Sequence, residues 1–372
     1  MLVKVLGIGR PNRGAELMLS AIEQQFHSRH PNVTIVTETT TDFFVRLLFL
    51  LNRKFRVPLL PYFIIDIPSY IPTSLRRFFR MISDADVDVV LDASGFAYGD
   101  QWGPEKLYQR LIYSSSTLRS RGQKLFVLPQ ALGPFTDPKF SDYLHSLVNF
   151  AEAVLPRDED SYNYLNAIVG ERSNVFPCPD FTNLVAPEIA TQLPGDVAII
   201  ANSKMIEMAA VSKSSTYIKV LAQTCNQLFE EGRKPFFLNH EGKSDRAVID
   251  SVVALIARPV DIVEPVDSLQ LKSIIGGCDY IISARFHGLA SALSQGVPCI
   301  AMGWSHKYIK LMEDYGVERF LIPVDVDKVR SSISEMETDR LTVVDQINSR
   351  SEYLKNRVSE MWRRVFESID AR

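Results

Sequence analysis

The sequence has few cysteines, and none of them stands in a metal-binding or disulfide-rich pattern. Its four cysteines, Cys178, Cys225, Cys278 and Cys299, lie far apart, and no CxxC pair is present. The short spacings of zinc sites and the cysteine density of small secreted domains are therefore both missing. We expect free thiols in a reducing cytoplasm, with no bound metal and no cofactor.

The chain also lacks an excess of charge of one sign and a long apolar run. Its formal net charge is −3 over 372 residues, so no basic field is present that would attract nucleic acid. The first residues reach a glycine and an arginine too early for the apolar region of a signal peptide. We therefore expect a cytoplasmic protein that does not bind nucleic acid.

Residues 43–80 are both apolar and basic. They contain seven Lys or Arg against a single acid, Asp66, and their longest uncharged run is shorter than the roughly 20 residues that span a bilayer. Two interpretations are open. The segment is either a crossover helix with a proline-rich extension packed on a sheet, or an interfacial patch that contacts anionic lipid at the inner face of the membrane.

Short apolar runs alternate with amphipathic stretches along the whole chain. Residues 2–9 read as a buried strand and are followed by a helical pattern, and the runs at 86–95, 124–133 and 174–180 also read as strands. Alternation of this kind is typical of an α/β fold with parallel sheets.

A segment with two prolines and a glycine, residues 186–196, interrupts the alternation and predicts a linker. We expect two Rossmann-like domains facing a cleft, in the GT-B-like arrangement. The N-terminal domain would cover residues 1–185 and the C-terminal domain residues 190–340. A helix at 341–372 would pack near the joint between them.

Arg285 and His287 stand where a predicted strand (280–283) meets a predicted helix. Ligands of open α/β sheets bind outside the carboxyl ends of the strands, and a helix start presents free N–H groups. An arginine fork can hold a carboxylate or phosphate, and a histidine can transfer a proton near neutral pH. The pair is either an anion site with a proton donor or a loop salt bridge beside a helix-capping histidine.

Lys307 follows the next predicted strand and is either an ammonium group for a phosphate or a solvated lysine. His240 ends the strand "PFFLN" and either enters the cleft or caps a helix.

The stretch "GIGRPNRGAEL" (7–17) resembles a phosphate loop but fits neither the dinucleotide fingerprint nor the P-loop. Asn12, Gly14 and Glu16 could instead bind sugar hydroxyls from a strand–helix junction. The alternative is a tight turn in which Glu16 complements the helix dipole.

The stretch "DASGFAYGDQWG" (92–103) follows a buried strand and mixes small, acidic and aromatic residues. Asp92, Ser94 and Tyr98 are candidates for binding a sugar acceptor, because aromatic faces and carboxylates suit sugar rings. Packing of a long loop is the equal alternative.

The motif "SARFHG" (283–288), followed by "GVPCIAMG" and "SHKYIKLMEDYG", resembles the polysaccharide pyruvyl transferase family. That family carries an arginine, a hydrophobic residue, a histidine and a glycine, then a G-V-P segment and a lysine early in the next helix. Further fragments occur in the family's order, and the resemblance covers roughly residues 1–320: "GRPNRGAELML" (9–19), "ALGPF" (131–135), "PRDEDSYNYL" (156–165), "CPD" (178–180) and "FFLNHEGKSD" (236–245). The chain departs from the family at 92–95, where "DASG" replaces a run of glycines.

The resemblance implies a fold like that of two-domain glycosyltransferases and a ketal-forming reaction. The enolpyruvyl group of phosphoenolpyruvate would move onto two hydroxyls of a saccharide, free or lipid-linked, with release of phosphate, in the biosynthesis of a cell-surface polysaccharide. The residues that it implies for the phosphoenolpyruvate site are Arg157, Arg285, Phe286, His287 and Lys307. Our hypothesis for His287 is the acid that protonates the methylene carbon or the base that takes the hydroxyl proton.

Two other functions fit the same architecture. A nucleotide-sugar glycosyltransferase would need an acidic residue for the ribose, and Glu313 and Asp314 are the nearby candidates. A non-catalytic carbohydrate-binding protein would not need Arg285, His287 and Lys307 together.

Overall fold

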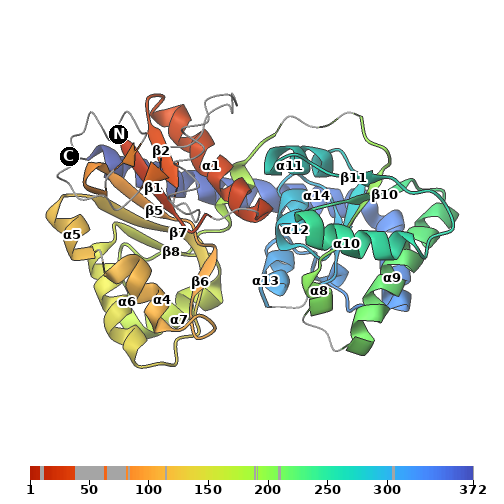
Figure 1. The fold of residues 1–372 in the computed structure, drawn as a ribbon, viewed down its shortest axis with the longest axis horizontal. Coiled ribbons are helices and arrows are strands. Elements are labelled where there is room, and N and C mark those ends of the chain that lie inside the picture. Colours follow the sequence, from red (N-terminus) through yellow and green to blue (C-terminus); the bar gives the residue numbers. More distant parts are fainter. Residues whose placement is uncertain are drawn as a thin grey trace. The chain divides into compact units, whose positions relative to one another are not determined.

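A computed structural model shows two compact units, each with its own parallel sheet (Figure 1). Unit 1 comprises Met1–Arg10, Met18–Phe181 and Val358–Arg372, and unit 2 comprises Pro11–Leu17 and Thr182–Arg357. The structure describes residues 1–8, 12–37, 63–64, 81–82, 84–113, 115–187, 190, 192–207, 211–303 and 306–371.

The sheet of unit 1 has the strand order β4-β3-β2-β1-β5-β7-β6, and β8 pairs with β7. Every described pair is parallel. The strands are β1 Leu2–Leu6, β2 Thr34–Thr37, β3 Phe63–Ile64, β4 Met81–Ile82, β5 Val89–Asp92, β6 Phe96–Tyr98, β7 Lys124–Leu132 and β8 Ala153–Pro156. The helical segments are α1 Arg13–Arg29, η1 Asp84–Asp86, α4 Pro104–Leu107, η2 Tyr108–Ile112, α5 Ser115–Ser120, α6 Lys139–Phe150 and α7 Glu159–Val169.

The sheet of unit 2 has the order β11-β10-β9-β12-β13, also with parallel pairs. Its strands are β9 Val197–Ile200, β10 Pro235–Leu238, β11 Ile262–Val263, β12 Tyr280–Ser283 and β13 Cys299–Ala301. Its helical segments are η3 Phe181–Leu184, α8 Lys204–Glu207, α9 Val211–Glu230, α10 Gly242–Val253, α11 Ser268–Gly276, α12 Phe286–Leu293, α13 His306–Asp314, η4 Glu318–Phe320 and α14 Val326–Asp370. The strands β9, β10, β12 and β13 are buried along their whole length, as expected of a sheet covered on both faces.

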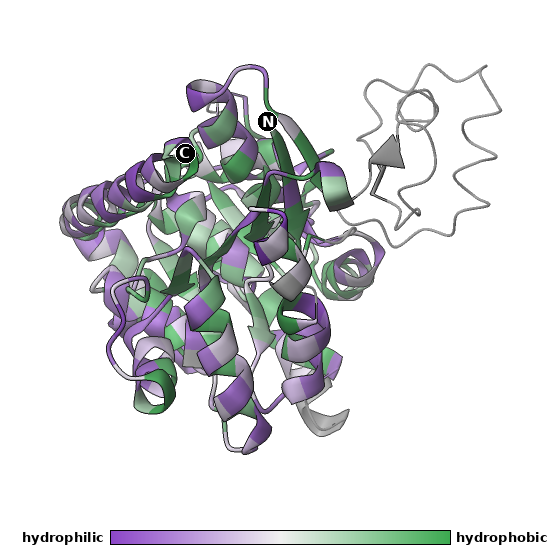
Figure 2. Ribbon diagram, turned by 90° about the vertical axis from the view of Figure 1, so that its left-hand side faces the viewer, coloured by the Kyte–Doolittle hydropathy of each residue, from purple (hydrophilic) through white to green (hydrophobic). Residues whose placement is uncertain are grey.

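Burial of apolar side chains against the sheets explains why the amphipathic segments become helices. In α6, for example, Phe140, Leu144, Leu147 and Val148 are buried and the intervening positions are more exposed. Figure 2 shows the strands mostly in green and the helices divided between green and purple faces. The predicted fold, two Rossmann-like α/β domains with parallel sheets, is confirmed in class.

Each sheet has a topological switch point, where the chain changes its direction of travel across the sheet. It lies between β1 and β5 in unit 1 and between β9 and β12 in unit 2. Ligands of doubly wound sheets bind in the crevice at the carboxyl ends of such a strand pair. We therefore look for ligand-binding polar side chains in the loops that follow these strands, which begin at Gly7, Ala93, Ala201 and Ala284.

Three features differ from the sequence-based expectations. The predicted strand 174–180 is only an isolated bridge from Val175 to Val154, because Pro177 and Pro179 have no N–H to donate to a ladder. The C-terminal helix is 45 residues long, begins at Val326, and contributes residues to both units. Residues 11–17, at the start of α1, belong to unit 2.

The four cysteines are buried free thiols. Among the described residues, no helix has the length and apolarity to cross a bilayer. Most of the segment 43–80 lies outside the described residues, so its contact with a membrane stays a prediction.

The end of α14 is held in unit 1 by an aromatic cluster around Trp362. This side chain is 2% exposed, and its ring centroid lies 6.0 Å from Phe26, 6.2 Å from Phe181 and 5.7 Å from Phe366.

We predict that Trp362→Ala lowers the free energy of unfolding of unit 1 by about 3–5 kcal/mol, measured by urea titration. Tyr113→Ala, at a position that is 74% exposed, should change it by less than about 1 kcal/mol. Equal losses would show that the aromatic cluster does not hold the helix end.

Candidate functional site

A fully buried carboxylate, Asp245 on α10, connects the ends of three strands in unit 2. Its oxygens accept hydrogen bonds from the backbone N–H of Ser203 (2.9 Å), after β9, and of Glu241 (3.1 Å), after β10. They also accept from the guanidinium of Arg285, after β12. A buried carboxylate with this many donors fixes the positions of its neighbours.

The guanidinium of Arg285 is bound on two sides. Its Nε lies 2.9 Å from Asp245 Oδ2, its Nη2 donates to Asp245 Oδ1, and its Nη1 donates to Glu241 Oε2. The fork that we expected to hold a substrate anion thus holds Asp245 in this structure. The two carboxylates differ, because the side chain of Asp245 is 0% exposed and that of Glu241 is 24% exposed. Burial raises the pKa of Glu241, and the positive charge of the neighbouring Arg285 only partly counteracts this rise.

The backbone before Arg285 is fixed by polar side chains from two other elements. The carbonyl of Ala284 accepts hydrogen bonds from Asn202 Nδ2 (2.7 Å) and from the hydroxyl of Tyr308 (2.9 Å). Gly288, the glycine of the R-F-H-G motif, packs on this turn. A Cβ at that position would lie 3.0 Å from Ser283 Oγ, so glycine allows the helix to start close to the strand.

Phe286 lies close to two of the other predicted donor-site residues, His287 and Lys307. It is 7% exposed, and its ring centroid lies 5.3 Å from that of His287 in an edge-to-face arrangement. The ammonium of Lys307, on α13, lies 5.2 Å from the Phe286 ring centroid. The structure therefore brings His287 and Lys307 to the Phe286 ring, and Arg285 directly precedes Phe286 in the chain.

The start of α1 packs directly on His287. A Cβ on Gly14 would lie 2.1 Å from His287 Nδ1, so only glycine leaves room for the imidazole there. Asn12 Oδ1 accepts a hydrogen bond from Ala15 N (3.1 Å) and caps the helix. Of the predicted acceptor residues, Gly14 thus lies against the predicted catalytic histidine, and Asn12 has a capping role.

Arg13 and Glu16 form an ion pair (2.7 Å) in the first turn of α1. Arg13 also donates to the backbone carbonyls of Pro265 and Val266 (both 2.9 Å), which attaches the start of the helix to the loop after β11. Glu16 was predicted for the acceptor, and the structure places it beside this arginine.

His240 is a buried imidazole whose ring nitrogens have no hydrogen-bond partner among the described residues. It follows β10 and is 4% exposed. Burial lowers its pKa well below the ordinary value, and the charges of Arg285, His287 and Arg13 lower it further. His240 is therefore a neutral side chain in a cationic neighbourhood, beside the residues of the R-F-H-G motif.

In unit 1, Asp92 and Ser94 lie together at the switch point between β1 and β5. The Ser94 hydroxyl donates to Asp92 Oδ1 (2.6 Å) and accepts from Arg110 Nη1 (2.9 Å), and Gln130 Nε2 donates to Asp92 Oδ2 (2.9 Å). Complete burial raises the pKa of Asp92. Gly7 (φ 82°) allows this approach, since a Cβ there would lie 2.4 Å from Ser94 Oγ.

Tyr98 is 1% exposed, and its burial together with the Asp92 charge raises its pKa.

Arg157, predicted for the donor site, lies in unit 1 and pairs with Asp180 at 3.6 Å. Glu313 and Asp314 are exposed, and Glu313 pairs with Lys310 at 3.3 Å. Among the described residues, no group of three or more metal-ligating side chains is close enough to hold a metal ion.

Sequence reasoning missed several partners of the predicted residues. Asp245 was visible as the last residue of "FFLNHEGKSD", but nothing in the pattern assigned it to Arg285, 40 residues away. Arg110 and Gln130 contact Ser94 and Asp92 but stand outside the motifs quoted from the sequence. Only the three-dimensional arrangement reveals these contacts.

The buried imidazole of His240 predicts a pH dependence of stability. Its folded-state pKa is below the unfolded value of about 6.5, so only the unfolded state takes up this proton as the pH falls through 6.5. Between pH 7.5 and 5.5, His240 should therefore cost unit 2 about 1.4 kcal/mol of stability. Hydrogen exchange of the β9 and β12 amides should show this loss.

The loss should largely disappear in His240→Gln and persist in His27→Gln, which changes an exposed histidine. If both variants lose as much stability as the parent chain, His240 is not the titrating group.

Comparison with known proteins identifies a family and a fold for this chain. The model of the polysaccharide pyruvyl transferase family matches residues 12–306. The chain is 21% identical over 272 residues to AmsJ, an amylovoran biosynthesis protein of Erwinia amylovora, which covers 66% of this chain and 63% of that protein. The chain thus spans less than two thirds of that relative.

Many solved structures share the fold. The UDP-GlcNAc 2-epimerase from Neisseria meningitidis superimposes with a TM-score of 0.57 at 12% identity, over 98% of this chain and 99% of its own. HepE from Anabaena, in complex with UDP-glucose, superimposes with a TM-score of 0.55 at 13% identity over 100% of both chains. The family expected from the R-F-H-G motif is confirmed: the chain belongs to the polysaccharide pyruvyl transferase family.

Proposed function

We propose that this protein transfers the enolpyruvyl group of phosphoenolpyruvate to a saccharide and forms a pyruvate ketal. The observation that carries the proposal is the position of His287 and Lys307 at the Phe286 ring, next to Arg285, which follows the switch-point strand β12 of unit 2. Family membership and the similarity to an amylovoran biosynthesis protein support a role in polysaccharide biosynthesis.

In the proposed donor complex, the substrate carboxylate replaces Glu241 on Arg285. Glu241 is the exchangeable partner, because its side chain is partly exposed and its burial already raises its pKa. Asp245 stays in place and keeps the guanidinium oriented. Lys307 and the N-terminal N–H groups of α12 then supply positive charge for the phosphate.

The proposed chemistry uses His287 for proton transfer. Protonation of the methylene carbon makes a methyl group and leaves an electron-poor carbon, which one sugar hydroxyl attacks. Phosphate then leaves, the second hydroxyl closes the ketal, and the two hydroxyl protons balance the new C–H bond and the released hydrogen phosphate. The imidazole packed between Gly14 and Phe286 is held in one orientation, as such a step requires.

The proposed acceptor site is the polar cluster of unit 1. Asp92 and Ser94 lie at the carboxyl ends of the central strands, where a doubly wound sheet binds its ligand. A carboxylate and a hydroxyl that already share a hydrogen-bond network can orient sugar hydroxyls. Tyr98 is buried and lies close enough to Asp92 for the Asp92 charge to raise its pKa.

The alternative donor is a nucleotide sugar, since HepE was solved with UDP-glucose. The exposed Glu313, paired with Lys310, offers no buried acidic group for a ribose. Release of phosphate from phosphoenolpyruvate, compared with release of UDP from UDP-sugars across one panel of saccharides, separates the two donors. Phosphate release without any UDP release is the expected result.

We predict that His287→Ala lowers the rate of phosphate release by at least about 100-fold, because a positioned proton-transfer group contributes that much. Circular dichroism should show an intact fold. His27→Ala, at an exposed position, is the matched control and should keep the parent rate. A near-native rate in His287→Ala would remove the histidine from the mechanism.

The two carboxylates on Arg285 should behave in opposite ways. Glu241→Gln removes a competing charge and should leave the KM for phosphoenolpyruvate unchanged or lower it. Asp245→Asn removes the charge that orients the guanidinium and should raise that KM at least about tenfold, or weaken the fold. A raised KM in Glu241→Gln would contradict the exchange, and this variant decides the question even if Asp245→Asn does not fold.

A further inference from the structure

His240, in the loop after β10, is a buried polar side chain that the described part of the protein leaves without a hydrogen bond. It is 4% exposed, and neither of its ring nitrogens has a partner among the described residues. A buried polar group in a native fold is normally hydrogen-bonded, because the loss of water around it is otherwise not offset. At the carboxyl end of a sheet strand, such an imidazole is a candidate for holding a ligand.

The backbone on both sides of His240 is fixed. The N–H of Asn239 donates to the carbonyl at the end of β11 (2.9 Å), and the N–H of Glu241 donates to Asp245 Oδ2 (3.1 Å). The carboxylate of Asp245 also binds Arg285, so one group sets the positions of the arginine and of the residue next to His240. The imidazole is thus presented from a rigid loop beside the guanidinium.

Positive groups from two other elements lie close to this imidazole. Burial lowers its pKa most, and the charges of Arg285 and His287, after β12, and of Arg13, at the start of α1, lower it further. Two acids, Glu241 and Asp245, are bound to Arg285, and a third pairs with Arg13. The imidazole is therefore a neutral hydrogen-bond donor in a place that favours a negatively charged ligand.

We propose that His240 is a further binding residue of the donor site and donates a ring N–H hydrogen bond to the carboxylate of phosphoenolpyruvate. The inference rests on the proposed function, in which that carboxylate replaces Glu241 on Arg285. Glu241 follows His240 in the chain, so an anion that takes its place arrives beside the imidazole. The sequence suggested His240 for the saccharide acceptor, whereas its neighbours in the structure are residues that we assign to the donor.

Bound phosphoenolpyruvate would also change the charge around His240. Its carboxylate and phosphate offset the positive charges of Arg285, His287 and Arg13, so the pKa of the imidazole should be higher in the complex than in the free protein. The complex would then hold a proton that the free protein lacks. The affinity for phosphoenolpyruvate should therefore rise as the pH falls through the pKa of the complex. An imidazole with only a structural role would not give this coupling.

The contact is tested by calorimetry on the full chain, with phosphoenolpyruvate and with ethyl phosphate, which lacks the carboxylate. His240→Leu should weaken phosphoenolpyruvate at least about tenfold at pH 7.0, because a hydrogen bond to a charged group is lost. Ethyl phosphate should change less than about twofold, since the phosphate lies elsewhere. His27→Leu, at an exposed position, is the matched control and should bind both ligands as the parent chain does.

The pH dependence separates contact with the donor from a structural role. Between pH 8.0 and pH 6.0, the affinity of the parent chain relative to His240→Leu should increase as the pH falls, by up to about tenfold per pH unit. Titration of the ligand itself cancels in this ratio. His240→Gln keeps an N–H donor but cannot titrate, so it should retain part of the affinity at pH 8.0 and lose the increase at lower pH.

Three results would overturn the proposal. They are parent-like affinity for phosphoenolpyruvate in His240→Leu, an equal loss of affinity for both ligands, and a ratio of affinities that does not change with pH. Because leucine fills the buried position with apolar atoms, circular dichroism should show that this variant keeps the parent fold.

Failure of this inference is distinguishable from failure of the proposed function, because equilibrium binding of the donor needs no acceptor. Phosphate release from phosphoenolpyruvate with a saccharide, together with parent-like binding in His240→Leu, would overturn the role of His240 and leave the transferase proposal intact. Loss of binding in His240→Leu, in a protein without any turnover, would support the role of His240 and contradict the transferase. A parent chain that does not bind phosphoenolpyruvate would contradict both.

Discussion

The buried ion pair between Asp245 and Arg285 is the interaction on which the geometry of unit 2 depends. It joins the ends of β9, β10 and β12 through one carboxylate, and it positions the two residues that follow Arg285 in the chain. A buried pair of this kind is stable only when its remaining hydrogen-bonding positions are filled, and here backbone N–H groups fill them. The arginine of the R-F-H-G motif therefore has a structural role in addition to any contact with a substrate.

The two units use the same topological rule to make sites of different character. At the switch point of unit 2, carboxylates surround the arginine, and a neutral buried histidine lies beside it. At that of unit 1, a buried carboxyl group is hydrogen-bonded to Ser94 and Gln130, and positive side chains open onto a pocket. We propose the first arrangement as the site of a small anion and the second as the site of a saccharide.

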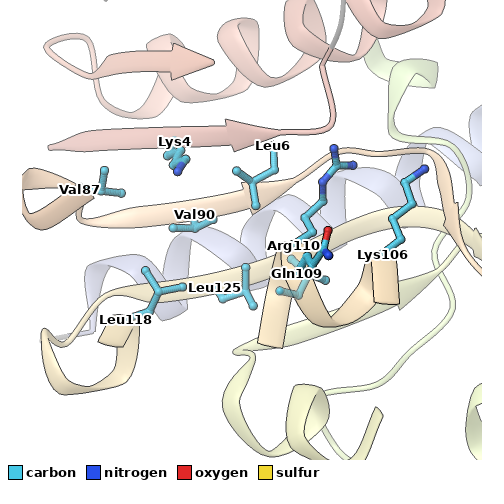
Figure 3. Close-up of a pocket in the computed structure, with 10 residues that line it drawn as sticks. Lys4, Leu6, Val87, Val90, Lys106, Gln109, Arg110, Leu118 and Leu125 are labelled. Atoms are coloured by element: carbon cyan, nitrogen blue, oxygen red, sulfur yellow. The ribbon is translucent and has the colours of Figure 1, made fainter. Parts of the chain in front are cut away.

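Periodicity alone predicted the parallel sheets, because alternating apolar runs and amphipathic helices leave few other solutions. The sequence also predicted that Arg285 and His287 follow a strand at the start of a helix, as they do after β12. The sequence did not predict that Arg285 binds Glu241 and Asp245, since no local pattern links residues 241, 245 and 285. The sequence pattern also did not predict the pocket of unit 1 at Lys106 and Arg110, because its lining residues come from five separate segments (Figure 3). The strand expected at 174–180 was wrong because the pattern considered hydrophobicity and ignored two prolines.

The contact between Lys106 and Trp102 gives the pocket an optical reporter. The ammonium lies 4.0 Å from the indole centroid, and the indole is 41% exposed, whereas Trp362 is 2% exposed in the aromatic cluster of unit 1. A molecule that draws the lysine towards itself changes the electric field at the first indole and leaves the second unaltered. With the remaining tryptophan, Trp304, replaced by phenylalanine, fluorescence would thus separate occupancy of the pocket from unfolding of the domain that contains it.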